Sequence, residues 1–289
     1  MMPRESLHTL ERNLQNPRTQ IEREIATLGP WFHNLHLPGG VQTVPDHPLG
    51  DFPRRKWECM RAFVPEDLHG CSALDIGCNA GFYSLELARR GAQVTAIDTG
   101  ERYLNQAAWA ADKLGLTDRI HLRLLDVYDL AALGRSFDLV LFLGVFYHLR
   151  YPLLGLDLVT SRARSALFFQ TLTMPQKGGL QCPENMAITD RDLLLDAAWP
   201  KMAFIEHALE GDPTNWWVPN HAAVEAMLRS CGWRSIQCLG EEIYHCQDPA
   251  PASSAGTRPG LFVGFTPGTA AASEPPRAPS RHGVLPRGE

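Results

Sequence analysis

The chain has 289 residues, of which 44% are hydrophobic and 20% charged, with a formal net charge of -5 at pH 7. This length allows one large core, the acidic balance argues against indiscriminate binding to phosphate backbones, and no apolar run approaches the roughly 20 residues of a membrane span. The N-terminus lacks the apolar core of a signal peptide and the seven Cys include no CxxC pair, so we expect a cytoplasmic protein without a zinc ribbon or a disulfide framework.

The first 70 residues are expected to form an N-terminal extension that covers a ligand. Residues 10–28 have the pattern of an amphipathic helix that stops at Gly29-Pro30. The next stretch, "WFHNLHLPGGVQTVPDHPLGDFPRRKW" at 31–57, is here named the aromatic segment. Its Pro, Gly and aromatic content suits neither a regular helix nor a central strand, and its length favours a functional role.

From residue 71 to 266 we expect one α/β domain. Strand patterns "SALDIG", "AQVTAID", "RIHLRLLD", "FDLVLFLG" and "SALFFQTLT" alternate with helical patterns near 83–90, 102–114 and 151–162. Alternation at this spacing predicts a doubly wound, mostly parallel sheet. Residues 174–220 fit this sheet poorly and are expected to form a cap insertion.

The last predicted elements of this domain distinguish a six-stranded dinucleotide-binding sheet from a seven-stranded sheet. A helix at 221–231 precedes two strand-like runs, "WRSIQCL" and "GLFVGF". A helix and two further strands after the fifth parallel strand are typical of the seven-stranded Rossmann-like sheet of methyltransferases. The remaining residues, 267–289, contain too few large apolar groups to fold, and we expect a disordered tail.

A glycine-bearing turn follows the first strand. Such a turn aims backbone N–H groups and a helix N-terminus at a ligand. The run from Gly77 to Phe82 fails the GxGxxG dinucleotide pattern at two glycines, which disfavours an NAD-dependent oxidoreductase. It resembles instead the GxGxG turn of class I S-adenosylmethionine (SAM) methyltransferases, with Gly77, Asn79 and Gly81 at the three positions. Asn tolerates the left-handed backbone better than other side chains do.

Three acids accompany this turn. Asp98 closes the second strand about 20 residues after Gly77, where a carboxylate can bind two ribose hydroxyls. Asp75 lies within the first strand and is expected to orient the turn near the methionine amino group. Asp126 ends the third strand, and the resemblance implies that it, or the backbone beside it, meets the adenine edge.

A closer resemblance rests on "WFHNLHLP", "KWECM", "LDIGCNAGFY" and "GVFYHLRYPLLGLDLV". From Trp31 to Cys231 these motifs resemble the tRNA wobble-uridine carboxymethyltransferases and their plain methyltransferase relatives. The resemblance implies that Trp31, Lys56 and Trp57 cover the cofactor and that Tyr147 faces the transferred group.

One departure bears on the choice of methyl donor. The carboxymethyltransferases carry a Lys shortly after the "LP" of the aromatic segment, which pairs with the extra carboxylate of carboxy-SAM. Here Thr43 or a neighbour occupies that place, and Arg258 is a second candidate partner. A buried carboxylate without a cation costs several kcal/mol, so we expect SAM as the cofactor.

Next to Tyr147, His148 follows the fourth strand, where a near-neutral pKa suits a general base. The alternative is that His148 only caps a turn by a hydrogen bond. Trp216, Trp217 and Asn220 in the cap either shape the acceptor pocket or belong to the core. His33 and His36 are expected to be structural, and no metal site is predicted.

Three functions follow from these residues. The leading hypothesis is a SAM-dependent methyltransferase acting on O or N of a small-molecule or carbohydrate-like acceptor. The second is modification of tRNA, for which a short basic stripe is available at Arg54, Arg55, Lys56 and Arg61. The third is a non-catalytic SAM-binding regulatory module. The sequence names neither the acceptor nor the oligomeric state, and it predicts no membrane partner.

Overall fold

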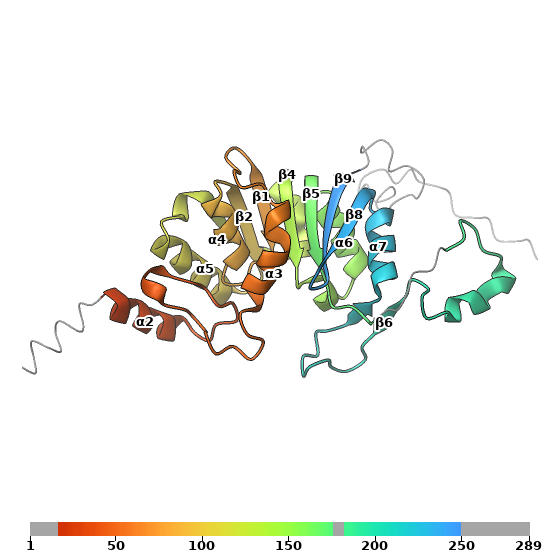
Figure 1. Ribbon diagram of the computed structural model, residues 1–289, viewed down its shortest axis with the longest axis horizontal. Helices are drawn as coiled ribbons and strands as arrows, with labels where there is room; N and C mark the ends of the chain where they lie inside the picture. The colour runs from red at the N-terminus through yellow and green to blue at the C-terminus, as the bar shows by residue number, and fades with distance from the viewer. Residues whose placement is uncertain (1–16, 176–181, 250–289) are drawn as a thin grey trace, which may run out of the picture. The chain divides into compact units, whose positions relative to one another are not determined.

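The computed structural model describes residues 17–175 and 182–249, and its centre is a seven-stranded sheet (Figure 1). The strand order is β3-β2-β1-β4-β5-β9-β8. The five parallel strands are β1 (Ser72–Ile76), β2 (Gln93–Asp98), β3 (Ile120–Leu124), β4 (Phe137–Leu143) and β5 (Ala163–Gln170). The last two, β8 (Trp233–Gly240) and β9 (Ile243–Pro249), are antiparallel, with β9 between β5 and β8. The predicted α/β, mostly parallel, seven-stranded methyltransferase sheet is confirmed.

Helices cover both faces of this sheet because the central strands are apolar on both sides. Along β4, Leu139 and Leu141 pack into one core and Val140 and Phe142 into the other, as the two-residue period of a strand requires. The first core includes residues of α3 (Phe52–Met60), α4 (Phe82–Arg89) and α5 (Glu101–Lys113). The second includes residues of α6 (Pro152–Thr160) and α7 (His221–Ser230). Short 3-10 turns connect these elements at Pro38–Gly40, Arg61–Phe63, Thr117–Arg119, Val127–Leu133 and Phe146–His148.

The N-terminal extension is more regular than its sequence suggested. Helix α2 (Pro17–Leu28) ends just before Gly29-Pro30, as predicted, and residues 10–16 lie outside the described part. The expectation of irregular chain is wrong for the end of the aromatic segment, which enters α3 at Phe52. Pro53 stands in the first turn of α3, where its missing N–H costs no hydrogen bond.

The cap contains its own two-stranded antiparallel sheet, β6 (Met202–Phe204) and β7 (Trp217–Pro219). It also contains a 3-10 helical stretch, Ile188–Leu195, which has no buried residue. The cap strand β6 and the aromatic segment lie at the same edge of the central sheet in Figure 1.

The final strand differs from the one predicted. Strand β9 is formed by residues 243–249, directly after β8, while "GLFVGF" and the tail 267–289 lie outside the described residues. The proposed boundaries at 70, 174–220 and 266 stay predictions. No helix among the described residues is long and apolar enough to cross a membrane, and the cytoplasmic location also stays a prediction.

Candidate functional site

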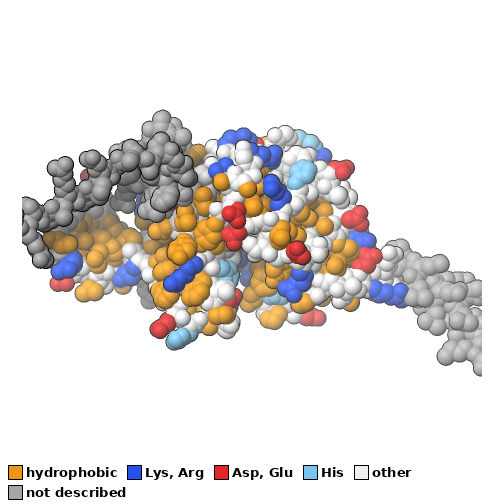
Figure 2. All heavy atoms as spheres, turned by 180° about the vertical axis from the view of Figure 1, so that it is seen from behind, with side chains coloured by type: hydrophobic (Ala, Val, Ile, Leu, Met, Phe, Trp, Pro, Cys, Tyr) orange, Lys and Arg blue, Asp and Glu red, His pale blue; other side chains and the backbone are white. Residues whose placement is uncertain are grey.

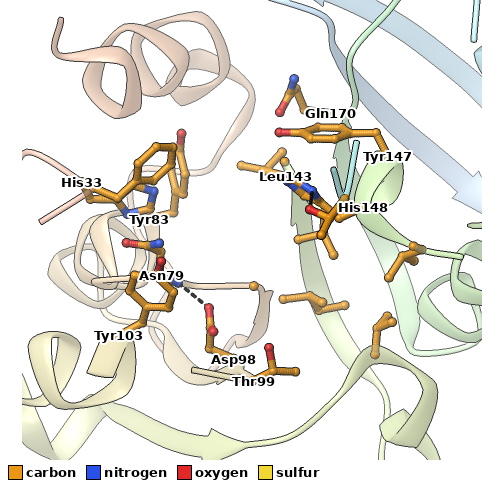
Figure 3. A pocket seen from close by; sticks show the side chains of 18 of the residues that line it. His33, Asn79, Tyr83, Asp98, Thr99, Tyr103, Leu143, Tyr147, His148 and Gln170 are labelled. Atoms are coloured by element: carbon orange, nitrogen blue, oxygen red, sulfur yellow. Dashed lines mark hydrogen bonds between the residues drawn. The ribbon is translucent and has the colours of Figure 1, made fainter. Parts of the chain in front are cut away.

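A cavity of about 810 Å³ lies at the carboxyl edge of the sheet, where the chain order reverses between β1 and β4. Open α/β sheets bind ligands at this place. The glycine turn, the end of β2 and the aromatic segment form one wall, and the loop after β4 with the end of β5 forms the other (Figure 3). Of the predicted site residues, the cavity wall includes Lys56, Gly77, Asn79, Asp98, Asp126, Tyr147 and His148.

The glycine turn has left-handed backbone at three residues, with φ of 68° at Gly77, 51° at Asn79 and 83° at Gly81. Glycine adopts this conformation freely and Asn at modest cost. A Cβ on Gly77 would lie 2.4 Å from Cγ2 of Val145, so glycine keeps this part of the cavity open. A Cβ on Gly81 would lie 3.0 Å from the Cβ of Ala107 in α5. Gly81 therefore allows helix packing and does not line the cavity.

Asp98 joins the end of β2 to the glycine turn. Its Oδ2 accepts a hydrogen bond from the Asn79 N–H at 2.9 Å, and its Oδ1 accepts one from the Gly100 N–H at 2.8 Å (Figure 3). Each carboxylate oxygen has a further lone pair. The side chain is thus held in place on the cavity wall with capacity for two hydroxyl donors.

Asp126 also lies on the cavity wall, but it does not end the third strand. Strand β3 stops at Leu124, and Asp126 caps the following turn by accepting a hydrogen bond from the Tyr128 N–H at 2.8 Å. Thr99 and Tyr103, between Asp98 and Asp126 in the chain, line the cavity as well. Neither was predicted, because side-chain direction at the start of α5 is not visible in the hydrophobic pattern.

Asp75 lies beneath the cavity rather than on its wall. Its carboxylate is buried and accepts a hydrogen bond from the Ser84 hydroxyl at 2.6 Å. Burial raises the pKa of Asp75 to about 6, although this hydrogen bond opposes the shift. Asp75 ties β1 to α4, and this contact agrees with a role in orienting the turn between them.

The aromatic segment reaches the cavity through different rings from those predicted. Trp31 is buried, with its indole N–H donating to the Ile25 carbonyl at 2.8 Å. Trp57 is buried under the guanidinium of Arg90, which lies 5.0 Å from its ring centre. Neither Trp lines the cavity, and the segment instead contributes Phe32, His33, Leu49, Phe52, Arg55 and Lys56.

His33 is a buried polar group on this wall. Burial lowers its pKa to about 3, so the ring is neutral, and its buried Nδ1 has no hydrogen-bond partner among the described residues. His36 pairs with Asp51 at 2.6 Å and does not line the cavity. No group of three or more His, Cys, Asp or Glu in the described part of the chain could hold a metal ion.

Thr43 does not occupy the position from which a missing lysine would act. It is buried, its hydroxyl accepts from the Leu35 N–H and donates to the His33 carbonyl, both at 2.8 Å, and it does not line the cavity. A cation nevertheless reaches the cavity from α3, because Lys56 Nζ donates to Gln170 Oε1 at 3.0 Å. Burial lowers the pKa of Lys56, and nearby Glu242 opposes this shift. Arg258 lies outside the described residues.

On the opposite wall, Tyr147 and His148 occupy the turn after β4 (Figure 3). Burial raises the pKa of Tyr147 to about 12, so its hydroxyl stays protonated. His148 Nδ1 lies 2.9 Å from the Thr214 hydroxyl and 3.9 Å from Asp212 Oδ2. Burial lowers the pKa of His148, and Asp212 opposes this shift. A backbone bond from Trp216 N to Tyr147 O, at 2.8 Å, ties the cap to this turn.

The other predicted cap residues contribute to the cap itself. Trp216 stacks on Phe204 with 6.0 Å between ring centres, and Trp217 also contacts Phe204. Asn220 caps α7 by accepting from the Ala223 N–H at 2.9 Å. None of these three predicted residues lines the cavity. The cap instead contributes Asp212 and Thr214 to the wall, which the sequence pattern did not indicate.

The residues present fit SAM as a ligand. The Gly77 turn leaves space that a Cβ would fill, and Asp98 has unused acceptor capacity. On the same cavity wall, the buried Nδ1 of His33 has no hydrogen-bond partner within residues 17–175 and 182–249. The strand order, the left-handed turn after β1 and the acid at the end of β2 are those of the class I methyltransferases. Residues 73–159 match the family described as "Methyltransferase domain". In its fold, and in sequence over these residues, the chain is similar to the class I SAM-dependent methyltransferases.

Its curated relatives are tRNA-modifying enzymes. It is 26% identical over 232 residues to the tRNA U34 carboxymethyltransferase of Aeromonas salmonicida, covering 79% of this chain and 63% of the relative. To the enzyme of that name from Pseudoalteromonas translucida it is 28% identical over 185 residues, covering 63% of this chain and 50% of the relative. The chain thus spans about half to two thirds of the length of these relatives, and the predicted resemblance is confirmed.

A solved structure supports the fold. The N-terminal domain of EvdMO1, crystallised with S-adenosylhomocysteine and D-fucose, has a TM-score of 0.52 and 23% sequence identity. The alignment covers 80% of this chain and 95% of that domain.

Proposed function

We propose that the protein transfers the methyl group of SAM to a hydroxyl of a small, carbohydrate-like acceptor, with His148 as general base. The observation that carries the proposal is the hydrogen-bonded row His148, Thr214 and Asp212 on the cavity wall. Asp98 and the glycine turn would hold the adenosine and Lys56 and His33 would lie near the remainder of the cofactor. SAM supplies an electrophilic methyl carbon on a sulfonium.

The hydrogen bonds of this row determine which nitrogen of His148 can act as the base. The Thr214 hydroxyl donates to Asp212 Oδ1 at 2.6 Å, so its oxygen accepts from His148 Nδ1. The proton therefore resides on Nδ1, and Nε2 keeps the lone pair. The lowered pKa keeps the ring neutral at pH 7, and the Asp212 charge stabilises the imidazolium that forms as the acceptor loses its proton.

Tyr147 has a different part in this proposal. Because its pKa is raised to about 12, it acts as a hydrogen-bond donor and not as a base. Catalysis otherwise consists of aligning the acceptor oxygen with the methyl carbon.

A transfer assay tests this proposal. The protein is incubated with methyl-labelled SAM and, separately, with a small-molecule extract rich in sugars and with bulk tRNA. We expect label in the small-molecule fraction and a loss of roughly 10²-fold or more in His148→Gln, as for removal of a general base, with SAM binding retained. His207→Gln, an exposed His of the cap, is the matched control. Label in tRNA alone would overturn the choice of acceptor, and SAM binding without transfer to either fraction would favour the non-catalytic module.

Transfer to tRNA is the second candidate. The names of the relatives favour it, and Arg55 and Lys56 of the predicted basic stripe line the cavity. Against it, acidic side chains lie among the basic ones on the face shown in Figure 2, and the cap places the carboxylate of Asp212 on the cavity wall. Phosphate backbones bind best to continuous basic surfaces.

A further inference from the structure

Glu242 occupies a strained position at the edge of the cavity. It is the second of two residues, Glu241 and Glu242, that turn β8 into β9, with φ of 49° and 59°. Two-residue hairpins of this kind favour Asn and Gly, because other side chains crowd the backbone when φ is positive. Non-glycine residues kept in such a conformation cluster at functional sites. The strained backbone therefore favours a functional role for Glu242.

The register of β9 brings this side chain to the cavity. Ile243 pairs with Gln170 at the end of β5, so Glu242 comes next to Gln170. One oxygen of Glu242 accepts from both the N–H and the hydroxyl of Thr173, each at 2.7 Å. The other accepts from the Gln170 amide at 3.4 Å. The carboxylate is held firmly by neutral donors.

Gln170 links Glu242 to the partly buried Lys56. Its Oε1 accepts from Lys56 Nζ at 3.0 Å while its Nε2 donates to Glu242. Lys56, Gln170 and Glu242 all line the cavity. The Gln170 amide lies near the hydroxyl of Tyr147 (Figure 3). A Cβ on Gly144 would lie 3.6 Å from that hydroxyl and 3.7 Å from Gln170 Oε1. The negative charge of Glu242 thus offsets the positive charge of Lys56 within the protein, near the Tyr147 end of the cavity.

We infer that Glu242 selects the donor by charge, offsetting Lys56 and excluding a donor whose transferred carbon carries a carboxylate. This inference rests on the proposed function, since it names the group that the same site accepts. A carboxymethyl donor would bring a second carboxylate beside Glu242 in a partly buried cavity, where like charges repel more strongly than in water. A plain methyl group brings no such charge. Lys56 alone would attract the carboxylate, and Glu242 cancels that attraction.

Direct binding of two donors tests the inference without any acceptor. Calorimetry with SAM and with carboxy-SAM is carried out on the wild-type protein, Glu242→Gln and Glu241→Gln. The glutamine amide oxygen can still accept from Thr173, so the hairpin is retained, and thermal melting checks this. Glu241 is the matched control because it neighbours Glu242 but pairs with Arg55 at 3.2 Å, on the exposed side of the turn.

We expect the wild-type protein to bind SAM at least about tenfold more tightly than carboxy-SAM. Glu242→Gln should raise the affinity for carboxy-SAM by about tenfold and change that for SAM by less than about threefold. Glu241 also acts on the Lys56 charge, but from the exposed side of the turn, so Glu241→Gln should change the ratio by less than about threefold. Adding Lys56→Met to Glu242→Gln should remove the gain, because the attracting cation is then gone.

Two results would overturn the inference. One is an unchanged ratio of the two affinities in a folded Glu242→Gln protein, and the other is an equal gain for both donors. Wild-type protein that binds neither donor would overturn the proposed function itself, and with it this assignment of Glu242.

Discussion

We predict that Asp98→Ala lowers the affinity for SAM by at least tenfold. The Asp98 carboxylate sits at the end of β2 and is oriented by the N–H groups of Asn79 and Gly100 at 2.9 and 2.8 Å. Each oxygen has a lone pair left for a ribose hydroxyl. Alanine removes both acceptors and also leaves the two N–H groups without their partner.

The magnitude follows from the hydrogen bonds lost. Bonds to a charged group are worth about 1.5–3 kcal/mol each, so two give about 3–6 kcal/mol. With 1.4 kcal/mol for each factor of ten, the full loss would be about 10²-fold to 10⁴-fold. Water molecules that replace the carboxylate would restore part of the lost binding free energy. We therefore take a tenfold loss of SAM affinity as the minimum expected effect.

Calorimetric titration with SAM measures the change, and thermal melting shows whether the variant is folded. Asp138→Asn is the control, because Asp138 accepts from the Ser72 N–H and hydroxyl at 2.9 and 2.7 Å near the start of β4, away from the cavity. It should bind SAM as the wild-type protein does. Unchanged SAM affinity in folded Asp98→Ala would refute the assignment of Asp98 to the cofactor.

Three further outcomes are expected. Burial raises the folded-state pKa of Asp75 from 3.8 to about 6, because the protonated side chain is favoured in the buried site. Its contribution to the free energy of unfolding is therefore fully present below pH 3.8 and is lost as the pH rises through 6. Asp75→Asn should therefore gain up to about 3 kcal/mol of unfolding free energy at pH 8 and little at pH 4, measured by urea denaturation; equal effects at both pH values would contradict this. Gly77→Ala should abolish SAM binding. Gly115→Ala has a similar positive φ but no atom of the described residues within 4 Å of the new Cβ, and it should only lower the melting temperature. By NMR titration the pKa of His148 should lie below 6.5 and should fall further in Asp212→Asn, because that change removes the negative charge that favours the protonated ring. A His148 pKa that is the same in the wild-type protein and in Asp212→Asn would show that Asp212 does not act on His148.

Much of the fold follows from local patterns. The five parallel strands and the helices between them were predicted because burial on both faces requires continuous apolar runs, and covering helices require a period near 3.6. The glycine turn and Asp98 were also predictable, since a backbone with positive φ and a strand-end carboxylate depend on neighbouring residues in the chain. Strand β9 was not predicted from the sequence, because its turn, Glu241-Glu242, lacks the Asn and Gly residues that are typical of a two-residue hairpin.

The sequence by itself determined the five parallel strands, the glycine turn and the acid at the end of β2, while the tertiary structure decided the final hairpin and which side chains complete the cavity. Trp31 and Trp57 entered the core, because these large rings gain most from burial, and Phe32 and His33 were left to line the cavity. Thr214 and Glu242 reach the cavity from segments far along the chain. No local pattern encodes such a meeting, because it depends on how the cap and the final hairpin pack against the strand ends.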